Sequence, residues 1–296
     1  NYFSSLQEVT VDGILDGLNP YNRQSARLNL DIAVTNKLKL KLNGNLIKTK
    51  GSEVEQQGQG DNLFFNLLTA VPTDDLAQKD SNGNFIPFFP GNGYVNEYQN
   101  PLYLANTVKN DREDRRFIGG ITANYTFTNE FSFTTSISLD RNSFYYRNLF
   151  PKGFDSGSQP NANLDDGFIF VRNRFTNRVN SSVQLNYQKQ FGDINLRSSF
   201  RYLFEDIDDE LFDASSSTFQ TEGVETLGQG TTNISVGSAL FKEKTQNFFL
   251  TADVDWKDKI ILGGLIRTDR SSLFGENNRD QIFYRGSLAY RLGEDL

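Results

Sequence analysis

The chain has 296 residues, with 30 Lys and Arg against 37 Asp and Glu, a formal net charge of -7, and no Cys, His or Met. The absent residue types exclude disulfides, Cys or His metal sites and imidazole-based catalytic triads, so we expect neither an enzyme nor a cofactor. The negative charge argues against a nucleic-acid partner, because phosphate binding needs a positive surface.

Apolar residues do not gather into a run of about 18, the length that a membrane-spanning helix needs. The longest candidate, Ile260 to Ile266, is short. A spanning β-protein remains possible at a mean hydropathy of -0.52, because its strands need apolar residues only at every second position. The sequence opens at Asn1 without Met or an apolar leader, and we expect that processing or truncation has removed its start.

Apolar and polar side chains alternate strictly along several segments, which is the period-two signal of a β-strand. In the clearest segment Phe131, Phe133 and Ile137 alternate with Ser132 and Thr134. In chain order the pattern occurs over residues 27–34, 38–46, 117–127, 131–140, 183–188, 194–202, 248–256 and 284–292. Residues 259–270 are apolar on both faces and are also expected to be a strand. The pattern predicts nine strands, with a candidate tenth within 1–12.

Short and long connections alternate between these strands. The short ones are Thr35 to Lys37, Thr128 to Glu130, Phe191 to Asp193 and Lys257 to Asp258, which suit tight hairpins. The long ones run over 49–115, 147–176, 206–242 and 271–280. Outer-membrane barrels show this asymmetry, with short periplasmic turns and long extracellular loops.

A soluble sandwich also alternates along its strands and is the competing interpretation. The predicted strands of about 12 to 16 residues exceed the usual globular length of ~5–6, which favours a membrane-spanning wall. Aromatic residues near the short turns resemble an interfacial girdle: Phe127, Phe131, Tyr187, Phe191, Trp256 and Tyr290. The polar face, with Asn124, Ser136, Asn186, Arg197 and Arg201, is expected to border a wet interior.

The run from Arg267 to Arg279 reads RTDRSSLFGENNR. It resembles the R-x-D-G-S-S-x-F-G-x-x-N-R signature of the SusC/RagA family of TonB-dependent outer-membrane transporters, with Arg270 in place of the usual Gly. Residues 21–30 resemble the family's R-x-N-L-R-L-N-L-D strand, 62–84 its helix followed by N-G-N, and Asn100 to Leu102 its N-P-L motif. The resemblance covers nearly the whole chain in collinear order.

The resemblance implies an all-β fold, in which residues 1–296 are a transmembrane antiparallel β-barrel segment of about 9–10 strands from a barrel of about 22. The plug domain, the TonB box and the remaining strands lie outside this segment. It further implies active import of an oligosaccharide or peptide across the bacterial outer membrane. The implied partners are a SusD-like surface lipoprotein, TonB, and the lipid and lipopolysaccharide of that membrane. The alternatives are a surface adhesin or lectin-like β-protein without transport, and a siderophore-type TonB-dependent receptor.

Substrate contacts are expected from aromatic rings on the first long loop, which can stack on sugars or grip a peptide but can equally pin the loop. The candidates are Phe88, Phe89, Tyr94, Tyr98 and Tyr103. After Asp61, the apolar residues Leu63 to Val71, stopped by Pro72, predict a short amphipathic helix in this loop.

Two acidic segments invite a calcium interpretation. Glu205, Asp206, Asp208, Asp209 and Glu210 are expected at the start of an outer loop, where a solvated loop is the favoured interpretation over a calcium site. The segment from Asp80 to Asn84 has its Gly83 at the wrong position for an EF-hand, so an Asn-Gly hairpin turn is favoured there.

Overall fold

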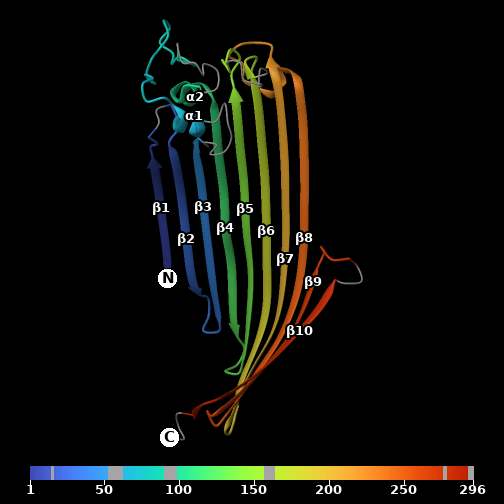
Figure 1. Ribbon diagram of the computed structural model, residues 1–296. Helices are drawn as coiled ribbons and strands as arrows, with labels where there is room; N and C mark the ends of the chain where they lie inside the picture. The colour runs from blue at the N-terminus through green and yellow to red at the C-terminus, as the bar shows by residue number, and fades with distance from the viewer. Residues whose placement is uncertain (15–16, 53–62, 90–98, 157–163, 276–278, 293–296) are drawn as a thin grey trace.

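The computed structural model describes residues 1–14, 17–52, 63–89, 99–156, 164–275 and 279–292, and it is dominated by one antiparallel sheet. Ten strands follow one another in the sheet in chain order, so each pairs only with its neighbours in sequence (Figure 1). The strands are β1 (Tyr2–Val11), β2 (Tyr21–Ala33), β3 (Leu38–Ser52), β4 (Lys109–Thr126), β5 (Phe131–Phe150), β6 (Phe168–Phe191), β7 (Ile194–Phe219), β8 (Gly230–Trp256), β9 (Ile260–Ser271) and β10 (Asp280–Tyr290). The all-β class, the strand count and the tenth strand near the N-terminus are confirmed.

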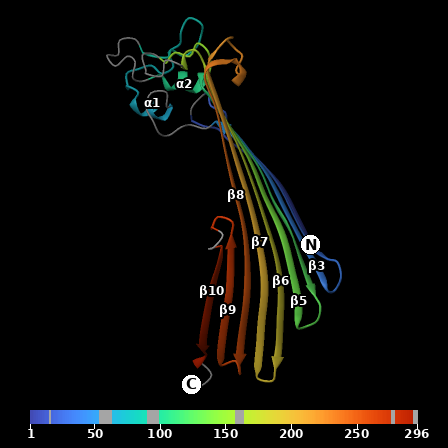
Figure 2. The same ribbon diagram turned by 90° about the vertical axis from the view of Figure 1, so that its right-hand side faces the viewer.

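The sheet is a curved wall and not a closed barrel, because β1 and β10 stand at opposite edges and each pairs on one side only. Figure 2 shows the strands fanning down from the end that carries the helices, with β9 and β10 reaching less high than β8. Beside β9, the ladder of β8 begins at Thr245 and runs down to Trp256. Lys244 is still hydrogen-bonded to Ser272, and the described part of β8 above Lys244 pairs with β7 alone.

The lower end of the wall has tight turns, as the sequence predicts. The connections comprise residues 34–37, 127–130, 192–193 and 257–259. Gly192 has a φ of 59°, and Lys257 and Asp258 have φ values of 52° and 55°, the left-handed conformation that two-residue hairpin turns require. Each turn reverses the chain without leaving a long exposed backbone segment.

Strand register gives the wall two chemically different faces. Leu30 of β2, Leu42 of β3 and Ile121 of β4 are directly opposite one another, and Ile121 is paired with Ile137 of β5. We call this the outer face. Its apolar part extends from Leu38 to Leu46 in β3 and from Phe131 to Leu139 in β5, which matches the ~9–11 residues that a tilted strand needs to cross hydrocarbon.

The opposite, inner face is polar over the same height. Thr134 donates to the Asn124 amide oxygen at 2.9 Å, and the Ser136 and Ser182 hydroxyls are 2.8 Å apart. Asn186, Arg197 and Arg201 share this face by register. The predicted two-sided pattern is therefore present across β4 to β7, whereas β9 also carries apolar residues, Ile261 and Leu265, on its inner face.

Aromatic rings gather where the outer face meets the tight turns. Tyr125 and Phe127 are 4.8 Å apart between ring centroids, and Phe131 and Tyr187 are 4.6 Å apart. Trp256 ends β8, and Tyr290, which ends β10, is paired with Ile260 just across the turn from Trp256. Rings in this position suit the boundary between hydrocarbon and headgroups, as the sequence predicts.

The upper strand ends differ from the sequence-based expectation, because the strands run further. Residues 220–229 join β7 to β8, not 206–242; residues 151–167 join β5 to β6, not 147–176; and residues 53–108 lie between β3 and β4, not 49–115. Strand β9 ends at Ser271 and β10 begins at Asp280, so residues 272–279 join them where 271–280 was expected. Above the apolar band both faces carry polar and charged side chains, so alternation disappears although the hydrogen-bonded ladder continues.

Helices and packed loops cover the inner face at the upper end. The short helix α1 (Leu63–Thr69) confirms the predicted loop helix, and α2 (Pro101–Thr107) follows it; Asp61 lies outside the described residues. Leu104 of α2 packs with Phe150 of β5 and Phe154 in a buried cluster. None of the described helices is long and apolar enough to cross a membrane.

The N-P-L motif is explained by a helix cap. Asn100 is fully buried, and its side-chain oxygen accepts a hydrogen bond from the Leu102 amide at 2.9 Å at the start of α2. Its amide nitrogen donates to the Leu76 carbonyl at 3.0 Å. The motif thus caps α2 and ties it to the preceding loop.

We predict that a charge on the outer face is costly while the same charge on the inner face is tolerated. Ile137 and Ser138 are neighbours on β5 that face opposite sides. Ile137→Arg is expected to lower the unfolding free energy in lipid vesicles by about 2–4 kcal/mol, as for cations at the midplane of barrels. Denaturant titration measures it; equal losses for Ile137→Arg and Ser138→Arg would contradict the assigned faces.

Candidate functional site

A polar groove of about 580 Å³ lies on the inner face, above the level of the apolar band. Strands β4, β5, β6 and β7 all contribute to it, so its side chains are positioned by the sheet ladder and not by a loop. Its lining residues are Arg112, Asp114, Arg116, Asp140, Asn142, Phe144, Arg172, Arg174, Thr176, Arg178 and Leu211.

Three arginine–aspartate pairs cross the strands in and beside this groove. Each is bidentate: Arg116 Nη2 lies 2.6 Å from Asp140 Oδ2, Arg172 Nε 2.8 Å from Asp213 Oδ1, and Arg174 Nη2 2.5 Å from Asp209 Oδ2. We call these six residues, together with Arg178, the mouth ladder. Bidentate pairing fixes the guanidinium planes as well as the charges.

Arg178 differs from the other arginines of the mouth ladder. It is directly opposite Asp140 in the register, but the Asp140 carboxylate is occupied by Arg116. Arg178 forms no ion pair with any described residue, and its side chain is exposed. An exposed guanidinium held among paired charges is suited to bind a carboxylate or another planar anion.

Among the aromatic residues expected to contact substrate, Tyr103 lies on α2 in the upper loops. Tyr103 stacks on Phe154 with 5.5 Å between ring centroids, and its hydroxyl accepts a hydrogen bond from the Asp155 amide at 2.8 Å. Burial raises the pKa of the Tyr103 phenol. Tyr103 also borders a polar hollow of about 740 Å³ among the upper loops. The described contacts of Tyr103 therefore pin the loop.

The other expected substrate-contacting residues are Phe88, Phe89, Tyr94 and Tyr98. Phe88 and Phe89 are half-buried. Tyr94 and Tyr98 lie outside the described residues. The proposal that these rings contact a substrate stays a prediction.

The acidic cluster is on β7 and not at a loop start, which corrects the expectation. Asp206 and Asp208 face outward and meet Lys244 at 3.2 Å and Lys242 at 3.4 Å; Asp209 faces inward and pairs with Arg174. Glu210 lies on the outer face beside Leu240, and Glu205 accepts from Thr245 at 3.1 Å. Alternation along the strand separates the carboxylates, and no described group of three or more acidic residues is arranged to hold a metal.

The Asp80 segment is a hairpin turn, as favoured. Asp80 Oδ1 accepts hydrogen bonds from the amides of Asn82 at 2.8 Å and Asn84 at 2.9 Å, and Gly83 has a φ of 86°. The hydrogen bond from the Asn84 backbone is the main cause that lowers the pKa of the Asp80 carboxyl. The Asp80 carboxylate therefore stabilises the turn by accepting hydrogen bonds from its backbone amides.

Residues of the motif that begins at Arg267 contact the neighbouring strands β8 and β10. The Arg267 guanidinium lies over the Phe249 ring at 5.1 Å and near the Phe283 ring at 6.0 Å. The Ser272 hydroxyl accepts from the Lys244 amide at 2.9 Å, which ties the turn to β8. Arg270, in the place of the family's Gly, pairs with Asp280 at 3.1 Å.

Sequence reasoning missed the mouth ladder. The sequence feature that could have indicated it is a spacing of two or four residues within each strand. Arg172, Arg174 and Arg178 are at even positions of one strand, and Asp209 and Asp213 are at odd positions of the next, so each set lies on one face. Only the register shows that these two sets share a face.

The curved wall, its apolar outer band and its polar inner face define the class: a segment of a membrane-spanning β-barrel. No family model matches the chain. Two curated relatives, both from Formosa agariphila, are TonB-dependent receptors. TonB-dependent receptor P26 is 25% identical over 316 aligned positions and TonB-dependent receptor P3 is 23% identical over 301, and they match 100% and 99% of this chain. The chain spans 29% of the length of each relative.

Solved structures show the same fold. The RagAB peptide transporter aligns with a TM-score of 0.79 and 16% identity, covering 100% of this chain and 33% of that chain. BauA, the ferric preacinetobactin receptor from Acinetobacter baumannii, aligns with a TM-score of 0.53 and 9% identity, covering 97% of this chain and 40% of that chain. The chain thus resembles a barrel fragment of a SusC/RagA-like TonB-dependent transporter, as its motifs imply.

We predict that the loop cluster is stabilised by Phe154. The Phe154→Ala substitution is expected to reduce local stability by about 3–5 kcal/mol, because it empties a buried aromatic site between α2 and β5. Hydrogen exchange should then accelerate in residues 99–107 while the lower strands stay protected. Leu68→Ala, at a side chain that is 70% exposed, is the control; protection that survives Phe154→Ala would refute the role of the cluster.

Proposed function

We propose that this chain is part of the wall of an outer-membrane transporter that imports a nutrient with energy from TonB. Residues 1–296 belong to the β-barrel domain of about 22 strands, and the plug domain and TonB box lie elsewhere in the protein. The barrel holds the cargo, and TonB draws on the inner membrane to open the plug. This assigns transport, and no enzymatic reaction, to the chain.

The observation that carries the proposal is the continuous two-sided wall. Large apolar side chains such as Ile121, Ile137 and Leu250 remain 47%, 53% and 48% exposed on the outer face. A water-soluble adhesin would expose this band to solvent, whereas hydrocarbon accommodates it. The match of this chain, over 100% and 99% of its length, to part of two TonB-dependent receptors supports the same conclusion.

The partners proposed for this transporter rest on its similarity to known transporters and on the two faces of the wall. The higher structural similarity to the RagAB peptide transporter than to the ferric preacinetobactin receptor favours a SusC-like transporter over a siderophore receptor. We therefore assign a SusD-like surface lipoprotein as the lid over the upper loops. Lipid and lipopolysaccharide surround the apolar band, and TonB acts through the plug side.

The cargo is an oligosaccharide or peptide that passes the mouth ladder. Arg178 supplies an exposed guanidinium on the inner face, while Arg116, Arg172 and Arg174 are neutralised by aspartates. A cargo carboxylate, from an acidic sugar or a peptide terminus, is suited to this group. Hydroxyls and amides of the cargo find partners among the polar residues of the inner face.

Uptake in whole cells tests the function. Cells that produce the native protein should accumulate fluorescent oligosaccharides or peptides of one class, and accumulation should stop when the proton gradient is dissipated or when TonB is deleted. A strain that lacks the protein controls for other routes. Accumulation that continues without TonB or without the proton gradient would contradict the proposed function.

Arg178→Ala is expected to weaken cargo binding at the mouth by about tenfold, because a charge-assisted hydrogen bond is lost from the inner face. Isothermal titration of the purified protein with the imported cargo measures the change. Arg23→Ala, also on the inner face but on β2, is the matched control. Unchanged affinity in Arg178→Ala would remove this arginine from the cargo path.

A further inference from the structure

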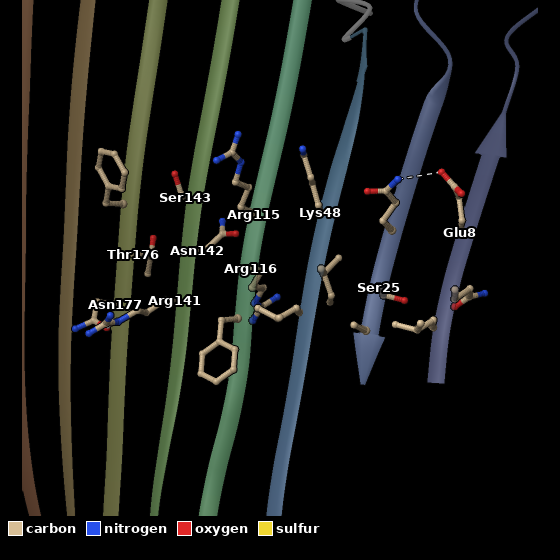
Figure 3. Close-up of a pocket in the computed structure, with 18 residues that line it drawn as sticks. Glu8, Ser25, Lys48, Arg115, Arg116, Arg141, Asn142, Ser143, Thr176 and Asn177 are labelled. Carbon is tan, nitrogen blue, oxygen red and sulfur yellow. Dashed lines mark hydrogen bonds between the residues drawn. The ribbon is translucent and has the colours of Figure 1, made fainter. Parts of the chain in front are cut away.

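A second groove, of about 880 Å³, lies on the outer face of the wall and is separate from the mouth ladder. It crosses the six adjacent strands from β1 to β6 (Figure 3). On each strand it is lined by two outer-face residues and by the residue between them, whose side chain points inward. We call it the headgroup groove.

Two cross-strand rows form the outer-face lining. From β1 to β4 the lower row consists of the successive partners Leu6, Ala26, Leu46 and Phe117. Over the same strands the upper row consists of Glu8, Gln24, Lys48 and Arg115. On β5 and β6 the lower row continues with Arg141 and Asn177, and the upper row with Ser143 and Phe175. Across β1 to β4, apolar side chains thus give way to charged and polar ones within one step of the register. That step is the upper boundary of the apolar band.

The basic side chains of this groove are poorly neutralised. Lys48 and Arg115 are directly opposite each other on β3 and β4, a like-charge pairing that destabilises a sheet. Among the described residues, the carboxylate that contacts these cations is Glu113, which pairs with Arg115, lies 3.1 Å from Lys50, and is 3.9 Å from Lys48. One negative charge is shared by three cations.

Arg141 adds a fourth cation at the β5 side. Its Nε donates to the neutral Asn177 amide oxygen at 3.0 Å, and its side chain is exposed. Figure 3 shows Lys48, Arg115 and Arg141 on neighbouring strands, with Glu8 at the far end of the groove. The Glu8 carboxylate accepts from the Asn22 and Gln24 amides at 3.2 Å and 3.0 Å, and Gln24 of β2 stands between Glu8 and Lys48 in the register. The negative charge of Glu8 is therefore held at the β1 end of the groove, away from the basic side.

We propose that the headgroup groove binds a phosphorylated lipid of the outer leaflet. The phosphate lies among Lys48, Arg115 and Arg141, and the acyl chains run down over Leu46, Phe117 and the apolar band below. This rests on the proposed placement of that band in the membrane, though not on the import of any cargo. Anionic headgroups sit at the height where the band ends, which brings the phosphate to the cations and leaves the hydrocarbon in contact with apolar side chains.

A phosphorylated lipid satisfies both halves of the groove at once. Free phosphate would meet the cations but leave the apolar lower row in water, and an unphosphorylated lipid would leave the cations unneutralised. The two requirements make the lipid distinguishable from either simpler ligand.

The experiment uses the native protein in detergent micelles, with bisphosphorylated lipid A, the same lipid after removal of its phosphates, and inorganic phosphate as separate probes. Native mass spectrometry measures the bound fraction. The wild-type protein should retain bisphosphorylated lipid A, and the combined Lys48→Gln, Arg115→Gln and Arg141→Gln variant should lose about tenfold or more in affinity. Folding of each variant is checked by its heat-dependent electrophoretic mobility.

The matched control removes the same number of cations from the inner face through Lys39→Gln, Lys41→Gln and Arg201→Gln, and it should retain the lipid. Equal affinity of the wild-type and outer-face variants would overturn the proposal, and so would equal binding of the dephosphorylated lipid or of inorganic phosphate alone. Uptake assays on the same variants keep the two proposals apart, because import that persists without the lipid contact leaves the proposed function intact.

Discussion

The backbone hydrogen bond is the constraint on which this structure depends. In hydrocarbon every amide and carbonyl needs a partner within the protein, which restricts a spanning chain to helices or to strands paired on both sides. Strands β2 to β9 meet this demand with antiparallel ladders to both neighbours in sequence, whereas β1 and β10, at the edges of the sheet, pair on one side. Because strand side chains alternate, the same ladder places apolar groups on one face and polar groups on the other.

A single strand register therefore produces both the apolar outer face and the polar inner face. The outer face carries Leu42, Ile121 and Ile137 in a single cross-strand row, and the inner face carries the hydroxyls and amides around Ser136. Higher up, where both faces meet water, the register arranges the mouth ladder inside and the headgroup groove outside. Transport and lipid anchoring are thus proposed for opposite sides of the same strands.

Much of the wall was predictable because hydrocarbon imposes a pattern that can be read from one residue to the next. The alternation around Phe131 and Leu250 and the tight turns at Gly192 and Asp258 were sufficient for the strand order and the faces. The upper strand ends were not predictable in this way: Asp206 and Lys244 look like loop residues until the register shows that they are partners. The mouth ladder could not be predicted from the sequence for the same reason, because its ion pairs join residues on neighbouring strands that are 24 to 41 positions apart in the chain.

The aromatic candidates show a different limit. Sequence alone cannot tell a ring that grips a ligand from a ring that holds a loop, and Tyr103 makes the contacts of the second kind with Phe154 and Asp155. Asn100 was visible only as part of a motif, yet its burial and its cap of α2 give the motif a physical meaning.

The alternation of side chains also limits how such a chain changes in evolution. Inserting one residue within β6 would exchange its two faces from that point onward, and would disturb the mouth ladder and the lipid contact together. Length changes in the lower wall are tolerated only in pairs of residues or in the loops. The one shift of register between β7 and β8 falls at Ser215 to Ser217, far above the apolar band, where an odd residue can be absorbed without turning charge toward lipid.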